Sequence, residues 1–359
     1  MISLKFLALL FLLPSKLLYQ TILYFTVGSN FACKDIKTLL HSVASNHILD
    51  YVAASDLIGV SGRKVTIDQT LAGVKKTLTT EGHLPSNFGK MYLGSKHGRS
   101  HWIVEAPDRT TADPVVLYLH GGGFLFPTFD TQLKALVHIH RGLQNDRLSI
   151  LLVDYSLSPE VLFPGAINQV AHIFHKLVVQ EGNTNIWLMG DSAGGNMCVV
   201  LLKHIHSPIN AITTVIPERF RPRGAILISP WLNLDPKPVG SYLRNAKTDI
   251  LTFGMYRIFS EMYHPDTQLR RTLPISPFYS QSSDWEGVLP GMLLVLGGES
   301  EVIVDELLRW VEIAKIDRSS LGIQPRGMHD EFMLYTETFE SYKESYAYTA
   351  ITKFLKDNL

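Results

Sequence analysis

The chain has 359 residues, of which 46% are hydrophobic and 18% charged, enough apolar material for one large core. Its 33 basic residues balance its 33 acidic residues, so the formal net charge is zero and gives no long-range attraction to nucleic acid or to an anionic membrane. Its two cysteines, Cys33 and Cys198, have no metal-ligand spacing, and we expect no disulfide between them.

Residues 1–28 form an apolar N-terminal segment. As a helix, residues 6–27 would extend about 33 Å, close to the ~30 Å hydrocarbon core of a bilayer. Pro14 and Lys16, near its middle, make insertion more costly. A membrane anchor, a cleaved signal peptide, an interfacial hairpin-like segment and a buried helix are all open interpretations. We expect membrane association through this segment, at the endoplasmic reticulum.

From residue 99 onwards, short apolar runs alternate with longer helical patterns. Each run is apolar at consecutive positions, as expected for strands that are covered on both faces. The alternation predicts a mostly parallel sheet with right-handed crossovers. Two earlier runs, at 90–93 and 101–105, would add antiparallel edge strands. The runs that predict the main strands are 115–119, 149–153, 186–189, 225–228 and 292–296.

Two segments depart from this alternation. Residues 30–90 look helical and precede the sheet, within an N-terminal cap and edge region at 29–98. Residues 235–285 form a long insertion between two strand runs and are rich in Tyr, Phe, Met and Pro. Because long loops inside a compact domain are usually functional, we predict that both segments contribute to a cap over the active site. The main domain would then span residues 99–359, with its cap insertion at 235–285.

The sequence Gly190-Asp191-Ser192-Ala193-Gly194 lies between a strand run and a helical pattern. This context is typical of a nucleophile elbow, in which serine sits on a strained turn and small residues on either side let the backbones approach. The helix N-terminus behind it offers N–H groups and partial positive charge to an oxyanion. The pattern predicts Ser192 as a nucleophile, and a chance glycine-rich turn is the alternative.

The sequence His120-Gly121-Gly122-Gly123 directly follows the run at 115–119. Glycines leave the backbone N–H groups open to a substrate carbonyl oxygen. We predict an oxyanion hole formed by the N–H groups of Gly121, Gly122, Gly123 and Ala193. We expect His120, Asp191 and Asn196 to support these motifs, although plain turn and helix-start chemistry is an alternative for the last two.

Together with Val153-Asp154-Tyr155-Ser156-Leu157-Ser158-Pro159-Glu160, these motifs resemble the hormone-sensitive-lipase-like family, which includes arylacetamide deacetylases and fungal steryl acetyl hydrolases. The similarity runs from about residue 110 to the C-terminus. The apolar N-terminal segment makes the chain most similar to the fungal steryl acetyl hydrolases. The resemblance implies an α/β-hydrolase fold, with a mostly parallel central sheet flanked by helices and a helical cap. Ser158 is a departure, since family members usually have alanine there.

The nucleophile needs a base, and in this fold the chain order is serine, acid, histidine. His329, one of fourteen histidines, lies in a polar turn between the last strand run and the C-terminal helical pattern. It matches the family's catalytic histidine. His264 lies within the expected cap, and the others precede the acid candidates or lie on helical patterns, where structural roles are expected. We therefore predict His329 as the base.

The triad acid is expected between residues 299 and 306. Family members place an acidic residue in this loop, then an apolar pair, then an aspartate four positions on, so the resemblance implies Glu301 as the acid and Asp305 in support. Glutamate replaces the more common aspartate, but either carboxylate can orient the imidazole. Glu299 is the alternative acid, and Asp305 could instead cap the following helix.

The predicted reaction is ester hydrolysis through an acyl-enzyme, with no metal and no organic cofactor. The resemblance implies a steryl acetate or a similar short-acyl lipophilic ester as substrate. A broad-specificity carboxylesterase or lipase, a peptidase and, more remotely, a non-catalytic ligand-binding receptor are alternatives. We expect no nucleic acid and no obligate protein partner. Residues that could line an apolar pocket are Phe126, Tyr256, Phe259, Met262, Tyr263 and Phe278.

Overall fold

The computed structural model describes residues 3–28, 35–48, 65–95, 98–334 and 342–359. In this part of the chain, eight strands form one sheet in the order β1-β2-β4-β3-β5-β6-β7-β8. Strands β3 to β8 are parallel, and β1 and β2 extend the sheet in antiparallel fashion at one edge. The strands are β1 (Lys90–Ser95), β2 (Gly98–Val104), β3 (Val115–Leu119), β4 (Ser149–Asp154), β5 (Ile186–Asp191), β6 (Gly224–Ile228), β7 (Met292–Gly298) and β8 (Leu321–Gln324).

The mostly parallel sheet with antiparallel edge strands is confirmed. Consecutive apolar residues of each central strand serve both faces, because alternate side chains point to opposite sides. Leu117 and Leu119 of β3 belong to one core cluster, and Val116 and Tyr118 belong to the other. No strand was predicted at β8, because its sequence, Leu-Gly-Ile-Gln, has no apolar run.

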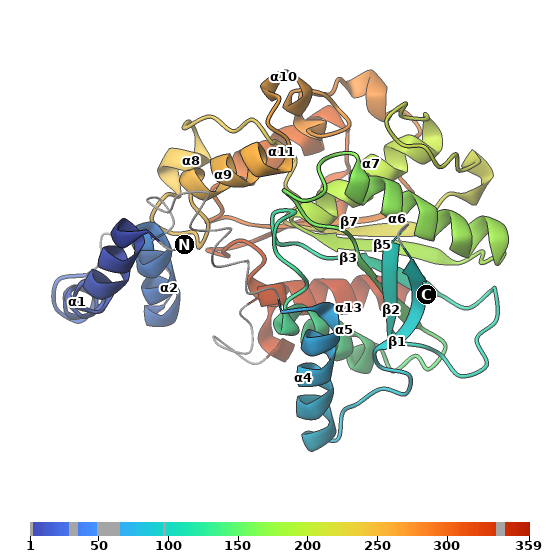
Figure 1. Ribbon diagram of the computed structural model, residues 1–359, viewed down its shortest axis with the longest axis horizontal. Coiled ribbons are helices and arrows are strands. Elements are labelled where there is room, and N and C mark those ends of the chain that lie inside the picture. The colour runs from blue at the N-terminus through green and yellow to red at the C-terminus, as the bar shows by residue number, and fades with distance from the viewer. Residues whose placement is uncertain (1–2, 29–34, 49–64, 96–97, 335–341) are drawn as a thin grey trace.

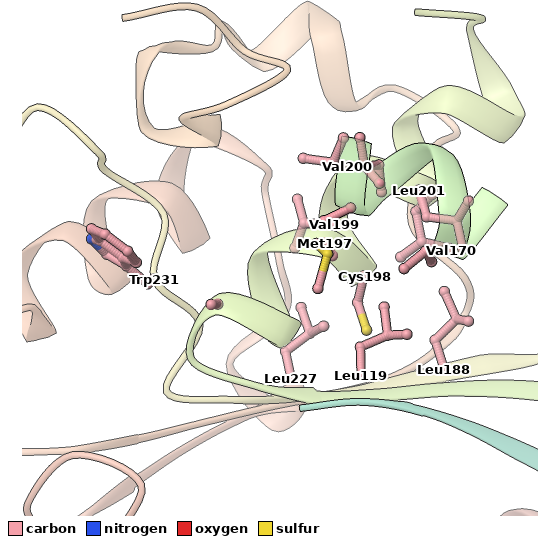
Figure 2. Packing of buried hydrophobic residues seen from close by; sticks show 14 of the residues in the cluster. Leu119, Val170, Leu188, Met197, Cys198, Val199, Val200, Leu201, Leu227 and Trp231 are labelled. Carbon is pink, nitrogen blue, oxygen red and sulfur yellow. The ribbon is translucent and has the colours of Figure 1, made fainter. Parts of the chain in front are cut away.

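One face of the sheet is covered by α6 (Gly165–His175), α7 (Ala193–His206) and α11 (Val304–Ile313) (Figure 1). A π-helical turn at Lys176–Gln180 continues α6. Helix α7 is buried along most of its length. Figure 2 shows Cys198 on the face of α7 that points toward Leu119 of β3, and it is a free, fully buried cysteine.

The other face is covered by α4 (Ile67–Thr80), α5 (Asp130–Leu143) and α13 (Tyr346–Asn358). Helix α4 begins with a capping box between Thr66 and Gln69 and packs its apolar side against α5. This helix therefore lies below the sheet in Figure 1, away from the insertion, and does not form the cap that was expected of residues 30–90. Residues 49–64 of that expected cap lie outside the described residues.

The insertion at 235–285 lies at one end of the α7 layer (Figure 1). Its longest helix, α9 (Phe253–Tyr263), begins at Thr252, whose hydroxyl accepts a hydrogen bond from the Met255 N–H. The shorter helices of the insertion are α8 (Ser241–Arg244), α10 (Thr267–Arg270), η3 (Pro277–Tyr279) and η4 (Ser282–Trp285). Elsewhere, single turns occur at η2 (Glu218–Phe220), η5 (Arg318–Ser320) and η6 (Tyr342–Glu344).

The N-terminal segment forms α1 (Leu4–Thr26), which is long and apolar enough to cross a membrane by length and composition. Helix α2 (Ile36–Ile48) packs along it. Lys16 Nζ lies 3.4 Å from His47 Nδ1, and His47 Nε2 lies 3.0 Å from the carbonyl oxygen of Leu9, so α2 supplies a polar partner for the lysine. Most large apolar side chains of α1 are exposed, among them Phe11.

Candidate active site

Ser192 lies on the turn between β5 and α7, at the carboxyl end of the sheet. Its backbone is strained, with φ 48° and ψ −113°, as expected of a nucleophile elbow. Its hydroxyl makes no hydrogen bond to the N-terminus of α7, so it is available to other groups. Gly194 allows the tight approach behind it, because a Cβ there would overlap the carbonyl oxygen of Leu119.

The structure brings the three predicted triad residues together. Ser192 Oγ lies 2.9 Å from His329 Nε2, and His329 Nδ1 lies 3.1 Å from Glu301 Oε2. All three side chains are buried. This arrangement suits a serine hydroxyl, a base that accepts its proton, and a carboxylate that orients the base.

Two donors hold the other carboxylate oxygen of Glu301. Ser229 Oγ donates to Oε1 at 2.6 Å, and the Gly298 N–H donates to the same oxygen. Oε2 is therefore left to face His329. Ser229 follows β6 with a positive φ of 41°, which turns its side chain into the site.

The alternative acids lie elsewhere. Glu299 Oε2 accepts a hydrogen bond from the Arg326 N–H at 2.9 Å. Asp305 forms an ion pair with Arg244 at 2.6 Å and accepts a hydrogen bond from the backbone of α8. Neither carboxylate contacts His329 in the described structure.

A further carboxylate lies against His329. Asp330 Oδ2 is 3.2 Å from Nε2, and Asp330 Oδ1 is buried without a hydrogen-bond partner among the described residues. Burial by itself lowers the pKa of His329, but the carboxylates of Asp330 and Glu301 outweigh it and raise this pKa well above its usual value. Burial raises the pKa of Asp330 to about 7. The two carboxylates thus favour the imidazolium form of His329.

The glycine loop after β3 lies beside Ser192, but its first amide points away. The Gly121 N–H donates to Asp191 Oδ1 at 2.9 Å, so the prediction that Gly121 contributes to the oxyanion hole is wrong. Gly122 and Gly123 line the pocket next to the serine. Gly123 has a φ of +61°, and a Cβ there would overlap the ring of Phe259, so only glycine fits.

Asp191 fixes this loop from behind. Besides the Gly121 amide, it accepts hydrogen bonds from the Tyr118 hydroxyl at 2.5 Å and from Gln132 Nε2 at 2.7 Å. Burial raises the pKa of Asp191, but its three donors favour the charged form. Asp191, the residue before Ser192, therefore joins the elbow to the glycine loop.

His120 and Asn196 also have structural partners. His120 Nδ1 lies 2.7 Å from the Gly121 carbonyl oxygen, its ring stacks on Tyr155 at 4.2 Å, and burial lowers its pKa to about 4. Asn196 Nδ2 donates to the carbonyl oxygens of Trp231 and Ile275 at 2.8 and 2.9 Å, which ties α7 to the insertion.

A cavity of about 70 Å³ opens onto the serine, and five of its twelve lining residues are Phe, Trp or Tyr. Of the six candidate pocket residues, Phe126, Tyr256 and Phe259 line it, so α9 forms part of its wall. Tyr263 instead stacks on Phe124, Met262 lies in the core, and Phe278 lies under Arg309. The cavity is lined by Gly122, Gly123, Phe126, Phe129, Ser192, Trp231, Leu251, Tyr256, Phe259, His329, Asp330 and Leu334.

Several site residues escaped the sequence analysis. Ser229 directly follows a predicted strand and Asp330 directly follows the predicted base, so proximity in sequence could have found both. Tyr118 and Gln132 are distant from Asp191 in sequence, and only the fold brings them within hydrogen-bonding distance of it. Asp249 lies within the insertion and carried no local signal, yet it accepts a hydrogen bond from the His329 N–H at 3.0 Å.

Known proteins resemble the chain over almost its whole length. A model of the steryl acetyl hydrolase family matches residues 4–354. "Putative steryl acetyl hydrolase mug81" of Schizosaccharomyces pombe is 30% identical over 356 residues, which cover 92% of this chain and 90% of that protein. The chain thus matches both a family and a full-length relative.

Solved esterases share the fold. A thermostable esterase from Pseudomonas putida has a TM-score of 0.62 at 20% identity, over 92% of this chain and 99% of its own. An esterase from the bacterial hormone-sensitive lipase family has a TM-score of 0.61 at 22% identity, over 90% and 98%. These similarities confirm the predicted α/β-hydrolase fold.

Proposed function

Because this chain belongs to the steryl acetyl hydrolase family, we propose that it is a serine hydrolase that removes the acetyl group from steryl acetates or similar short-acyl lipophilic esters. One observation carries the serine-type mechanism: Ser192 Oγ lies 2.9 Å from His329 Nε2, while His329 Nδ1 lies 3.1 Å from Glu301. The same succession of hydroxyl, imidazole and carboxylate serves acyl transfer on several unrelated folds.

In the proposed mechanism, His329 Nε2 accepts the hydroxyl proton while Ser192 Oγ attacks the ester carbonyl carbon. The N–H groups of Gly122, Gly123 and Ala193 stabilise the negative charge on the carbonyl oxygen. The C–O bond then breaks, and the leaving alcohol takes the proton from His329. Water, deprotonated by the same nitrogen, then attacks the acyl-enzyme carbonyl carbon. The bond from this carbon to Ser192 Oγ breaks, His329 returns the proton to Oγ, and the acid is released.

The small aromatic cavity supports a short acyl group. Phe126, Trp231 and Phe259 leave a volume of only about 70 Å³ next to the serine. Extra methylenes in a tightly packed site cost roughly 1–3 kcal/mol. We therefore expect kcat/KM for a steryl butyrate to be about 10- to 100-fold below that for the matching steryl acetate.

A panel of steryl acetates, steryl butyrates, p-nitrophenyl esters and triacylglycerols tests this proposal through kcat/KM for each substrate. Phe259→Leu, which removes part of one cavity wall, should narrow the difference between acetate and butyrate. A wild-type preference for long acyl chains would reject the short-acyl assignment and favour a lipase.

The second carboxylate at His329 predicts a displaced pH profile. The base must be neutral to accept a proton, so activity is lost as the pH falls through its pKa. Asp330 raises that pKa, and Asp330→Asn removes the negative charge 3.2 Å from Nε2. We expect the acid limb of kcat/KM for p-nitrophenyl acetate to move to lower pH by about 1–3 units.

The other ionisable groups around Asp330 are unchanged in this variant. Those near Asp330 are Glu301, Asp191, Tyr118 and Tyr256, and Asp249 lies near His329. An acid limb at an unchanged or higher pH in Asp330→Asn would mean that this carboxylate does not hold the proton on His329.

Membrane attachment through α1 is part of the proposal, and we place the protein at the endoplasmic reticulum. The exposed apolar side chains of α1 and its length support attachment. We expect the full chain to sediment with the microsomal membranes of a cell homogenate and to resist extraction by alkaline carbonate. Deletion of residues 1–28 should release it, and a full chain recovered in the soluble fraction would contradict the assignment.

A further inference from the structure

Residues 241–249, at the start of the insertion, hold the loop that carries Glu301. Ser241 Oγ donates to the Val302 carbonyl oxygen at 2.6 Å. Asn245 Nδ2 donates to the carbonyl oxygens of Glu299 and Glu301 at 2.9 and 2.8 Å. The bonds to Glu301 and Val302 are buried and the bond to Glu299 is partly buried, and together they fix the backbone of the acid loop at three points. This part of the insertion is therefore a scaffold for the acid loop.

Asp249 extends this scaffold to the loop that carries the base. Its Oδ2 accepts a hydrogen bond from the Val302 N–H at 2.8 Å, and its Oδ1 accepts one from the His329 N–H at 3.0 Å. Oδ1 also accepts the Ile250 N–H at 2.8 Å. The carboxylate is completely buried. One side chain thus joins the residue after Glu301 to His329 itself.

Resting on the proposed function, we propose that Asp249 is a positioning residue, whose carboxylate sets the distance and orientation between the Glu301 carboxylate and the His329 imidazole. It touches neither substrate nor reacting atoms, and acts through two backbone amides. The two loops are also joined further from the catalytic side chains. The Glu299 N–H donates to the Gln324 carbonyl oxygen at 3.0 Å, the Ser300 N–H to the Gly327 carbonyl oxygen at 2.9 Å, and the Arg326 N–H to Glu299 Oε2 at 2.9 Å. Asp249 adds a connection next to the two side chains that must meet.

The charge of Asp249 matters as well as its shape. It faces His329 and Glu301 and lies near the hydroxyls of Tyr256 and Tyr242. Burial raises the pKa of Asp249 to about 6, and the charge of His329 opposes this shift. By the same interaction, the negative charge of Asp249 favours the imidazolium form of His329.

The test is Asp249→Asn, which keeps the volume but has only one side-chain oxygen for the three N–H donors. We expect kcat for p-nitrophenyl acetate to fall roughly 10- to 100-fold, the loss expected from a small misplacement of catalytic groups, while KM changes less than about twofold. The acid limb of kcat/KM should also move to lower pH, because a negative charge near His329 is removed. A residue with a merely structural role would not shift that limb.

Glu306→Gln is the matched control. Glu306, in the first turn of α11, is also buried where the insertion meets this helix, and its carboxylate accepts hydrogen bonds from Asn233 and Tyr242. Its side chain makes no hydrogen bond to Glu301 or His329 in the described structure. Its variant should lower Tm and leave the acid limb in place. An Asp249→Asn enzyme with wild-type kcat and an unshifted limb would overturn the positioning role. If Asp249→Asn has no effect but Ser192→Ala abolishes activity, the positioning role is rejected and the proposed function stands.

Discussion

Replacement of Ser192 by alanine is expected to lower kcat for p-nitrophenyl acetate by on the order of 10⁶-fold, as in another hydrolase that lost its triad serine. The reason is that the Ser192 hydroxyl is the only one within hydrogen-bonding distance of His329 Nε2 in the described structure. Without it no acyl-enzyme forms, and the remaining rate comes from substrate binding and oxyanion stabilisation.

The measurement is kcat of the purified variant, together with its circular dichroism spectrum and Tm to establish that it folds. Ser207→Ala, at the other end of α7, is the matched control and should retain wild-type kcat, because Ser207 lies outside the cavity. Substantial activity in the Ser192→Ala variant would remove the nucleophile assignment.

Replacement of Glu301 by glutamine is expected to lower kcat by about 10⁴-fold, the effect of the matching amide substitution in a serine protease triad. Ser229 and the Gly298 N–H both donate to Oε1, so the amide oxygen should occupy that position. The amide NH2 then faces His329 Nδ1 and donates to it, which leaves the ring proton on Nε2. In that tautomer the imidazole cannot accept a proton from Ser192.

Glu299→Gln is the control for this prediction. It changes a carboxylate two residues away, which accepts a hydrogen bond from the Arg326 N–H and does not contact His329. We expect its kcat to lie within about twofold of wild type. Equal losses in both variants would show that the acid loop, rather than Glu301 itself, is sensitive to substitution.

Sequence alone could predict the elements that depend on local pattern. The strand runs are apolar at consecutive positions because both faces of β3 to β7 are buried, and the elbow and glycine loop follow two of these strands directly. Chain order and the family resemblance predicted His329 and Glu301, and the fold brings both next to Ser192. His329 lies 137 residues after Ser192 and 28 residues after Glu301 along the chain.

What sequence could not predict depends on direction and on distant contacts. Gly121 belongs to the glycine motif that was expected to supply oxyanion donors, but its N–H donates to the buried Asp191 carboxylate instead. Helix α4 has the amphipathic pattern of any surface helix, and this pattern does not say that its apolar face packs against α5. Asp249 lies 80 residues from His329, in a segment with no recognisable motif.

The two parts of the insertion have different structural roles. Residues 241–249 hold the acid loop through buried hydrogen bonds, whereas α9 contributes Tyr256 and Phe259 to the cavity wall. Any opening of the cavity should therefore involve α9 and leave residues 241–249 in place, since moving the latter would break bonds to the catalytic loops.

The most direct test of the catalytic assignment is covalent labelling by a fluorophosphonate, followed by mass spectrometry of the peptides. The reagent reacts with a hydroxyl only where a neighbouring base activates it. Our account predicts a single adduct on Ser192, formed slowly in His329→Ala and not at all in Ser192→Ala. Labelling of a different residue, or no labelling of an enzyme that hydrolyses esters, would contradict it.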